Sequence, residues 1–306
     1  MSRKKNYLFW SIVPLSLIIF GCISTGIPYF QLKDRVNKQI EAIRASKNTY
    51  KISPGQASYI KFPYYGPFKN EKLICDKIEI PFVIKKKNLE AFAFLSQSYF
   101  SSDKNFHCVF QFENSYAQNL EKIIVEDFEY PKETLNVDKK RVVLSNEDMQ
   151  QVQKENEFLS KIFANSSTTP FFNQAFIAPL NSKITSIFGT QRIFNKLKKT
   201  QHLGTDFRAR IGTQIRPANT GKVVFVGELF FGGNTIIIDH GLGVFTLYCH
   251  LSKPIVLEGM MVDKDTIIGE SGATGRVNGP HLHWGVKIHG NDVDGFSLIN
   301  ASENLF

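Results

Sequence analysis

The chain has 306 residues, of which 42% are hydrophobic, and a formal net charge of +9. This length allows two folded domains beside a short terminal segment. The positive charge favours anionic surroundings, but the chain has no nucleic-acid recognition module and no basic motif interleaved with aromatic residues, which argues against nucleic acid as a partner. Anionic lipid headgroups and peptide carboxylates are better candidates, beside the alternative of a merely soluble basic surface.

The N-terminal residues predict a membrane anchor over residues 1–32. Residues 6–32 contain no charged side chain and follow Arg3, Lys4 and Lys5. Their apolar part is long enough to span a bilayer, and the basic cluster places the N-terminus in the cytoplasm. We therefore expect a single-pass protein of the cytoplasmic membrane, with the rest of the chain periplasmic or extracytoplasmic.

Two alternatives to a spanning anchor remain open at this point. The residues at 19–22, Ile-Phe-Gly-Cys, resemble a lipoprotein processing site with Cys22 as the modified residue, although Phe20 is bulky where a small residue is preferred. A cleaved signal peptide would instead release the protein.

Residues 33–140 predict an N-terminal helix followed by a small β-domain. The helix is indicated by apolar residues at helical spacing, namely Leu32, Val36, Ile40 and Ile43. The strands are indicated by two alternating runs, Ile78, Ile80, Phe82 and Ile84, and Phe106, Cys108, Phe110 and Phe112. In an oxidising compartment Cys75 and Cys108 could form a disulfide, but Cys75 does not clearly share the buried face of Cys108, so the pairing stays open.

Residues 141–170 predict a helical linker between two β-domains. Ser145 and Asp148 fit a capping box at its start. An apolar stripe follows, made of Met149, Val152, Leu159, Ile162 and Phe163. The polar run at 165–170 ends the helix.

Residues 171–306 contain five residues whose types and spacing suit a metal-dependent hydrolase. His202 and Asp206 are four residues apart, so a bent loop can bring an imidazole and a carboxylate to one ion. His281 and His283, two apart on a strand, leave the same face of a sheet. Two imidazoles and one carboxylate would leave the fourth tetrahedral position of zinc open for water, as in catalytic sites. His250 is the fifth member of the set.

The residues around this set form motifs that agree in order and spacing with those of a known family. They are S-I-F-G at 186–189 with Arg192 following, H-L-G-T-D-F at 202–207, G-N-T-I-I-I-D-H-G at 233–241, Y-C-H-L at 248–251 and G-A-T-G-R-V-N-G-P-H-L-H-W at 272–284. Over about residues 175–295 the chain resembles the lysostaphin-type (LytM-like) zinc metalloendopeptidases of the bacterial cell wall.

This resemblance implies a mostly β fold, with an antiparallel sheet beneath a groove. It makes His202, Asp206 and His283 the ligands of one Zn2+ per chain, and His250 and His281 the catalytic pair, without separating their roles. The implied activity is hydrolysis of peptide bonds in peptidoglycan stem peptides or cross-links during cell-wall remodelling. The alternatives are a non-cutting wall-binding protein or regulator of a wall amidase, and a protease for another peptide.

Two further expectations complete the prediction. The region between anchor and enzyme could restrain the groove or dock a regulatory protein. Three histidines, His107, His240 and His289, are expected to serve structural roles, because none has neighbours that indicate a metal or catalytic site.

Overall fold

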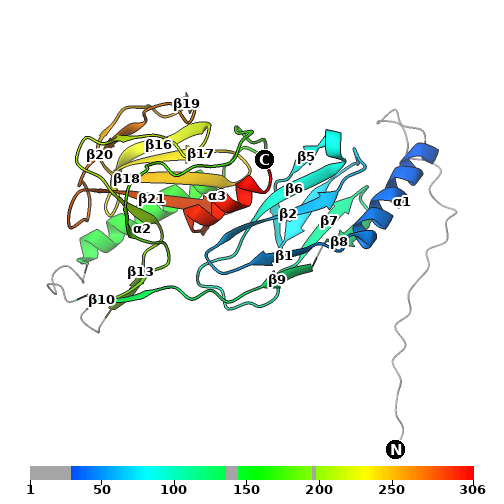
Figure 1. Ribbon diagram of the computed structural model, residues 1–306, viewed down its shortest axis with the longest axis horizontal. Helices are drawn as coiled ribbons and strands as arrows, with labels where there is room; N and C mark the ends of the chain where they lie inside the picture. The colour runs from blue at the N-terminus through cyan, green and yellow to red at the C-terminus, as the bar shows by residue number, and fades with distance from the viewer. Residues whose placement is uncertain (1–28, 121, 136–143, 195–197) are drawn as a thin grey trace, which may run out of the picture.

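The computed structural model describes residues 29–120, 122–135, 144–194 and 198–306, and these are mostly β-strands (Figure 1). The predicted membrane segment lies outside the described residues except for residues 29–32, which begin the first helix. Among the helices of the described ranges, none is both long and apolar enough to cross a membrane.

The predicted N-terminal helix is present as α1 (Tyr29–Ala45). Val36 and Ile43 are buried, and Leu32 and Ile40 pack beside them against the first sheets. The buried Gln39 satisfies both ends of its amide, because Nε2 donates to the Pro63 carbonyl at 2.6 Å and Oε1 accepts from the backbone N–H of residue 65 at 2.7 Å.

Three small sheets follow α1. Their order is β2-β6-β5, β4-β3-β7-β8 and a parallel pair, β1-β9. The strands of these sheets are β1 (Thr49–Ile52), β2 (Ala57–Pro63), β3 (Lys72–Cys75), β4 (Ile78–Ile80), β5 (Val83–Lys85), β6 (Glu90–Ser96), β7 (Cys108–Phe112), β8 (Tyr116–Asn119) and β9 (Lys122–Val125). The 3-10 helix η1 (Lys86–Asn88) lies between β5 and β6, and β10 (Lys132–Leu135), which follows β9, belongs to another sheet.

Two details of this half were not settled by the sequence pattern. The alternating run from Ile78 to Ile84 belongs to two strands in different sheets, β4 and β5, with Pro81 between them. Proline has no N–H for a strand ladder, so the chain changes sheet there. Cys75 and Cys108 are opposite each other on β3 and β7, both are buried, and they form a disulfide.

The predicted second helix is α2 (Asn146–Phe163), and its capping box is present. Ser145 Oγ accepts from the Asp148 N–H at 3.1 Å, and the Asp148 carboxylate accepts from the Ser145 N–H at 3.2 Å. The helix packs on the C-terminal sheet, where the rings of Phe163 and Phe245 lie 5.2 Å apart.

The C-terminal half is built on an antiparallel sheet of order β11-β14-β21-β18-β17-β16-β19. Three further strands pair off this path: β20 pairs with β18 and with β15, and β22 pairs with β21. A separate sheet, β10-β12-β13, lies beside it. The elements are β11 (Ile184–Ser186), β12 (Gln191–Phe194), β13 (Lys198–Gln201), β14 (Thr205–Arg208), β15 (Gln214–Ile215), β16 (Gly221–Leu229), β17 (Gly233–Asp239), β18 (Val244–Pro254), β19 (Met261–Val262), β20 (Gly269–Ser271), β21 (His281–Ile288), β22 (Asn291–Asp292) and α3 (Gly295–Glu303).

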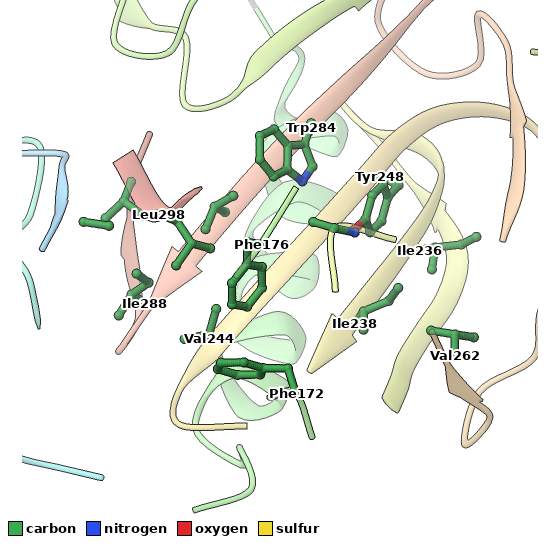
Figure 2. Close-up of a cluster of buried hydrophobic side chains, with 14 of the residues drawn as sticks. Phe172, Phe176, Ile236, Ile238, Val244, Tyr248, Val262, Trp284, Ile288 and Leu298 are labelled. Carbon is green, nitrogen blue, oxygen red and sulfur yellow. The ribbon is translucent and has the colours of Figure 1, made fainter. Parts of the chain in front are cut away.

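The main core lies on one face of this sheet and extends into the N-terminal half. Tyr248, Trp284 and Phe176 are among its largest buried side chains (Figure 2), and Phe92 and Phe94 of β6 belong to the same cluster. Figure 1 shows α3 between the two groups of strands. Because one cluster contains side chains of both halves, the two halves are held together by apolar burial as well as by hydrogen bonds.

Candidate functional site

The three predicted ligands come together at one end of the sheet. Asp206 Oδ1 lies 3.0 Å from His202 Nε2 and 2.9 Å from His283 Nδ1, and these two ring nitrogens are 3.1 Å apart. The same three residues form a group whose candidate ligand atoms all lie within 4.8 Å of one another.

Strand register explains this convergence. Asp206 on β14 is directly opposite His283 on β21. His281, two residues before His283, leaves the same face and places its Nε2 3.6 Å from Asp206 Oδ1, while Leu282 between them is fully buried on the other face. The two-residue spacing of His281 and His283 therefore places both rings on the same face of β21, as the sequence predicts.

Gly204 allows the loop before β14 to pass close to the site. A Cβ at this position would lie 2.4 Å from atoms of the His283 ring. Such a contact is not tolerated without movement, so a glycine is required where the loop bearing His202 crosses His283.

The outer nitrogen of His202 is fixed by neighbours. Nδ1 lies 3.1 Å from the Ile187 carbonyl oxygen and 3.1 Å from Ser186 Oγ. A carbonyl oxygen only accepts, so the neutral ring carries its proton on Nδ1 and presents the Nε2 lone pair to Asp206 and His283. Arg192 Nη2 in turn donates to Ser186 Oγ at 2.8 Å.

His250 and His281 flank the three predicted ligands. Their ring centroids are 4.8 Å apart, and the His250 centroid is 5.8 Å from that of His283. The Nδ1 of His250 donates to the Thr274 carbonyl at 2.9 Å, and that of His281 donates to the Gly279 carbonyl at 2.8 Å. A carbonyl oxygen only accepts, so Nδ1 carries a proton in each ring and Nε2 is the nitrogen left for proton transfer.

The backbone at His250 is unusual for a strand. Its φ is +62°, a left-handed conformation that non-glycine residues rarely adopt. The pairing of β18 with its neighbours shifts register close to this point. Such irregularities turn a side chain away from the direction that simple alternation gives it, and they recur beside active sites.

The electrostatics suit a cation. Burial opposes ionisation of Asp206, but its close interactions with the His202 and His283 rings outweigh burial and hold the pKa of Asp206 well below its usual range. Burial lowers the pKa of His283, and burial together with the nearby His283 and His281 lowers the pKa of His250 to about 4. An ionised carboxylate thus lies beside rings that favour the neutral state.

The donor set fits zinc. Ligand atoms about 2.0–2.1 Å from a tetrahedral zinc are about 3.3 Å from one another. The distances of 2.9–3.1 Å among the three atoms are close to this spacing. Two imidazole nitrogens and a carboxylate oxygen are also ordinary zinc donors, and Cys249, although near, is buried with its thiol pKa raised by burial to about 12.

The site opens into a groove of about 660 Å³. One side is formed beside β14 by residues that include Glu133, Arg192 and Leu203, and the other side by the turns after β16 and β20, with Phe231 and Arg276. Arg276 lies over the Phe231 ring at 5.9 Å.

The contribution of Glu133 to this groove was not predicted. It belongs to β10, which pairs in parallel with β12 and places Glu133 opposite Arg192. Nothing in the local sequence at Glu133 signals this pairing, because the two strands are far apart in the chain. The family resemblance places Arg192 near the groove but does not make it a catalytic residue.

Comparison with known proteins agrees with the site. Residues 200–295 match the family model of Peptidase family M23. Similar curated proteins include the peptidoglycan DD-endopeptidase ShyA of Vibrio cholerae, 40% identical over 119 residues (38% of this chain, 28% of that protein). Another is the DD-carboxypeptidase/endopeptidase Mpg of Neisseria meningitidis, 41% identical over 104 residues (34% of this chain, 24% of that protein). The matched part thus spans about a quarter of the length of these relatives.

The fold also has a similar solved structure. A crystal structure of an M23 peptidase from Pseudomonas aeruginosa superposes with a TM-score of 0.62 at 22% identity, covering 85% of this chain and 99% of that one. The similarity therefore extends beyond the groove into the N-terminal half, at the level of fold.

Proposed function

We propose that this chain, whose residues 200–295 form an M23 peptidase domain, is a zinc-dependent endopeptidase that hydrolyses peptide bonds in the stem peptides or cross-links of peptidoglycan. The observation that carries the proposal is the convergence of His202, Asp206 and His283 beside the pair His250 and His281 in one groove. The name of ShyA, a peptidoglycan DD-endopeptidase, supports the substrate, and the name of Mpg, a DD-carboxypeptidase/endopeptidase, supports the reaction.

His202, Asp206 and His283 would hold the ion through Nε2, a carboxylate oxygen and Nδ1. When bound, zinc supplies Lewis-acid chemistry there, polarising a carbonyl oxygen and acidifying water. The groove above the sheet orients the peptide, and its outer walls carry both a carboxylate and a guanidinium.

His250 and His281 would move the protons. Each ring has its Nδ1–H fixed by a backbone carbonyl and its Nε2 toward the groove. One ring, neutral at the start, accepts the proton of the attacking water on Nε2. The other ring enters the step protonated on both nitrogens, so that its Nε2–H donates a proton to the leaving amine or a hydrogen bond to the developing oxyanion. Two rings with centroids 4.8 Å apart can serve one scissile bond in this way.

The test is digestion of purified peptidoglycan with the full chain, followed by identification of the products by mass spectrometry. We expect cleaved stem peptides or cross-links, loss of products with a chelator and recovery when zinc is restored. His283→Ala should lose both stoichiometric zinc and products, because two remaining protein ligands hold the ion poorly. A zinc-loaded protein that sediments with the wall but releases no product would instead be a non-cutting binder or regulator.

We also propose that the enzyme is held at the cytoplasmic membrane by the part of the predicted anchor, residues 1–32, that precedes α1, with the folded part periplasmic or extracytoplasmic. The uncharged segment after Arg3, Lys4 and Lys5 and the disulfide in the N-terminal half support this location. The protein should fractionate with membranes and resist extraction by high salt, which removes only electrostatic attachment. A soluble, shortened species would contradict the anchor, and a lipid on Cys22 would replace the spanning model.

We further propose that a regulatory protein docks on the N-terminal half. Glu133, near the end of the N-terminal region of residues 33–140, lines the groove, so a partner bound to that region has a route to the active site. A partner that alters the rate of the wild-type chain should lose its effect when its docking surface is changed.

A further inference from the structure

Arg192 lies between two carboxylates that belong to different parts of the chain. Its Nη2 is 3.7 Å from Asp206 Oδ2, and its Nε is 3.8 Å from Glu133 Oε2. The parallel pairing of β10 with β12 puts Glu133 directly opposite Arg192. These separations are ion-pair distances rather than direct hydrogen bonds.

The guanidinium faces the side of Asp206 that the other predicted ligands leave open. Oδ1 is the oxygen near His202 and His283, whereas Oδ2 is the one near Arg192. Arg192 can therefore fix the rotation of the carboxylate without occupying the oxygen that faces the rings.

Arg192 also reaches a second predicted ligand through a hydroxyl. Its Nη2 donates to Ser186 Oγ at 2.8 Å, and this oxygen is 3.1 Å from His202 Nδ1. Nη2 thus lies beside Asp206 directly and reaches His202 by way of Ser186, while Nε of the same guanidinium faces Glu133. A single-point ammonium could not make the approaches of Nη2 and of Nε in the same geometry.

We propose that Arg192 is a positioning residue for the metal site, and that Glu133 sets the position of Arg192, so that the segment leading out of the N-terminal half contributes to metal affinity. This inference rests on the zinc site of the proposed function. It gives β10 a role beyond connecting the halves, because β10 supplies the carboxylate on the outer side of Arg192.

The expected losses of zinc affinity differ between changes at Arg192 and changes at Glu133. Outer partners of metal ligands typically change affinity by about 10–100-fold. The side chains of Arg192 and Glu133 are 27% and 49% exposed, so their pairing should be worth at most about fivefold. The effect of Glu133 should therefore be smaller than that of Arg192 and should pass through it.

The experiment measures zinc affinity of the full chain by competition with a chromophoric chelator, using Zn2+ as the only probe. We expect Arg192→Gln and Arg192→Lys to weaken affinity by about 10–100-fold. Glu133→Gln should weaken it by up to about fivefold in the wild-type background and not at all in the Arg192→Gln background. Glu126→Gln is the matched control, since it changes the same charge in an exposed pair with Lys51.

Two further measurements distinguish a loss of folding from a loss of zinc affinity. The unfolding midpoint of the zinc-free variants reports folding, and Ser186→Ala, which removes only the branch to His202, should give an intermediate loss of affinity even if Arg192 variants fold poorly. Wild-type affinity in a folded Arg192→Gln chain, or an equal effect of Glu133→Gln in both backgrounds, overturns the inference. A wild-type chain that binds zinc without cleaving peptidoglycan overturns only the proposed function.

Discussion

Gly204 shows how one missing side chain shapes the site. Because a Cβ there would lie 2.4 Å from the His283 ring, Gly204→Ala should displace that ring or the loop before β14. We expect zinc affinity to fall by about tenfold or more, the scale of disturbed ligand orientation. Zinc titration against a competing chelator checks this.

Gly279→Ala is the matched control for that experiment. Gly279 lines the same groove, but a Cβ there meets no atom within 4 Å and its backbone is outside the left-handed region. Equal losses in the two variants would mean that the contact with His283 is not the cause.

The predicted catalytic pair should separate metal binding from turnover. His250→Ala and His281→Ala leave His202, Asp206 and His283 intact, so zinc content by elemental analysis should stay near that of the wild type. Turnover on peptidoglycan should fall by about 100-fold or more, because each ring supplies proton transfer or oxyanion stabilisation.

A histidine outside the groove serves as the control for the His250 and His281 variants. His107→Ala, on an exposed residue of the N-terminal half, should change neither quantity. Wild-type turnover in either groove variant would remove that histidine from the mechanism.

For individual residues, the sequence predicted which side chains form the site better than it predicted where each side chain points. His281 and His283 were placed on one face correctly, because a period of two is a local property of a strand. The direction of His250 depends on its positive φ and on a shift of register, which arise from pairing with neighbouring strands. Local spacing carries no information on either.

Among the elements, β3 and β7 are joined covalently by Cys75 and Cys108, which are 33 residues apart. Replacing both with alanine should lower the free energy of unfolding by roughly 3–4 kcal/mol, mainly through the freedom regained by the unfolded chain. Urea unfolding of the two proteins measures the difference.

A reductant tests the same bond without changing the sequence. It should destabilise the wild type and leave the double variant unaffected. Cys249→Ala controls for the loss of a buried sulfur, since Cys249 is buried and free. A wild type insensitive to a reductant that demonstrably reached both sulfurs would contradict the expectation.

Elements whose own residues carry a clear pattern were predicted from the sequence. Features that depend on which strand pairs with which were not predicted. Helix α2 was found from its capping box and apolar stripe, both of which are local. The division of residues 78–84 between two sheets depends on which strand each segment pairs with, and Pro81 only marks the place. The pairing of β10 with β12 had no local signal at all.

For the whole molecule, we expect the free energy of unfolding to depend on pH through His289, a buried histidine whose hydrogen bond joins the two halves. His289 donates from Nε2 to the Phe94 carbonyl at 3.0 Å, and burial lowers its pKa from 6.5 to about 4. Between these values the unfolded chain binds the proton and the folded chain does not, so the free energy of unfolding rises with pH. Stability is lost as pH falls below about 6.5, by roughly 2 kcal/mol at pH about 5 for this one group.

The measurement is the pH dependence of urea unfolding for wild type and His289→Gln, whose amide keeps a donor near Phe94. The variant should lose about 2 kcal/mol less than the wild type between pH about 7.5 and 5. His107→Gln, on an exposed residue, should follow the wild type. Parallel curves for wild type and His289→Gln would show that His289 does not titrate between the two states.

The overall architecture was predicted only in outline. The mostly β class and the antiparallel sheet beneath a groove followed from strand-like segments and from motif resemblance. The shared core did not, because Phe92 and Phe94 show only that β6 has an apolar face, and not that its partners are Phe172 and Phe176 far along the chain.

This shared core also constrains the order in which the protein can be made. The Ala57 N–H donates to Ser297 Oγ at 2.7 Å, and Ser96 Oγ donates to the Ile288 carbonyl at 2.8 Å, so contacts of the early strands wait for residues synthesised some two hundred positions later. A nascent chain that has emerged only as far as β18 has neither β21 nor α3 to cover β2 and β6. The strand that carries His281 and His283 therefore emerges at the same late stage as the residues that cover the first sheet, so the groove and the early half are completed together.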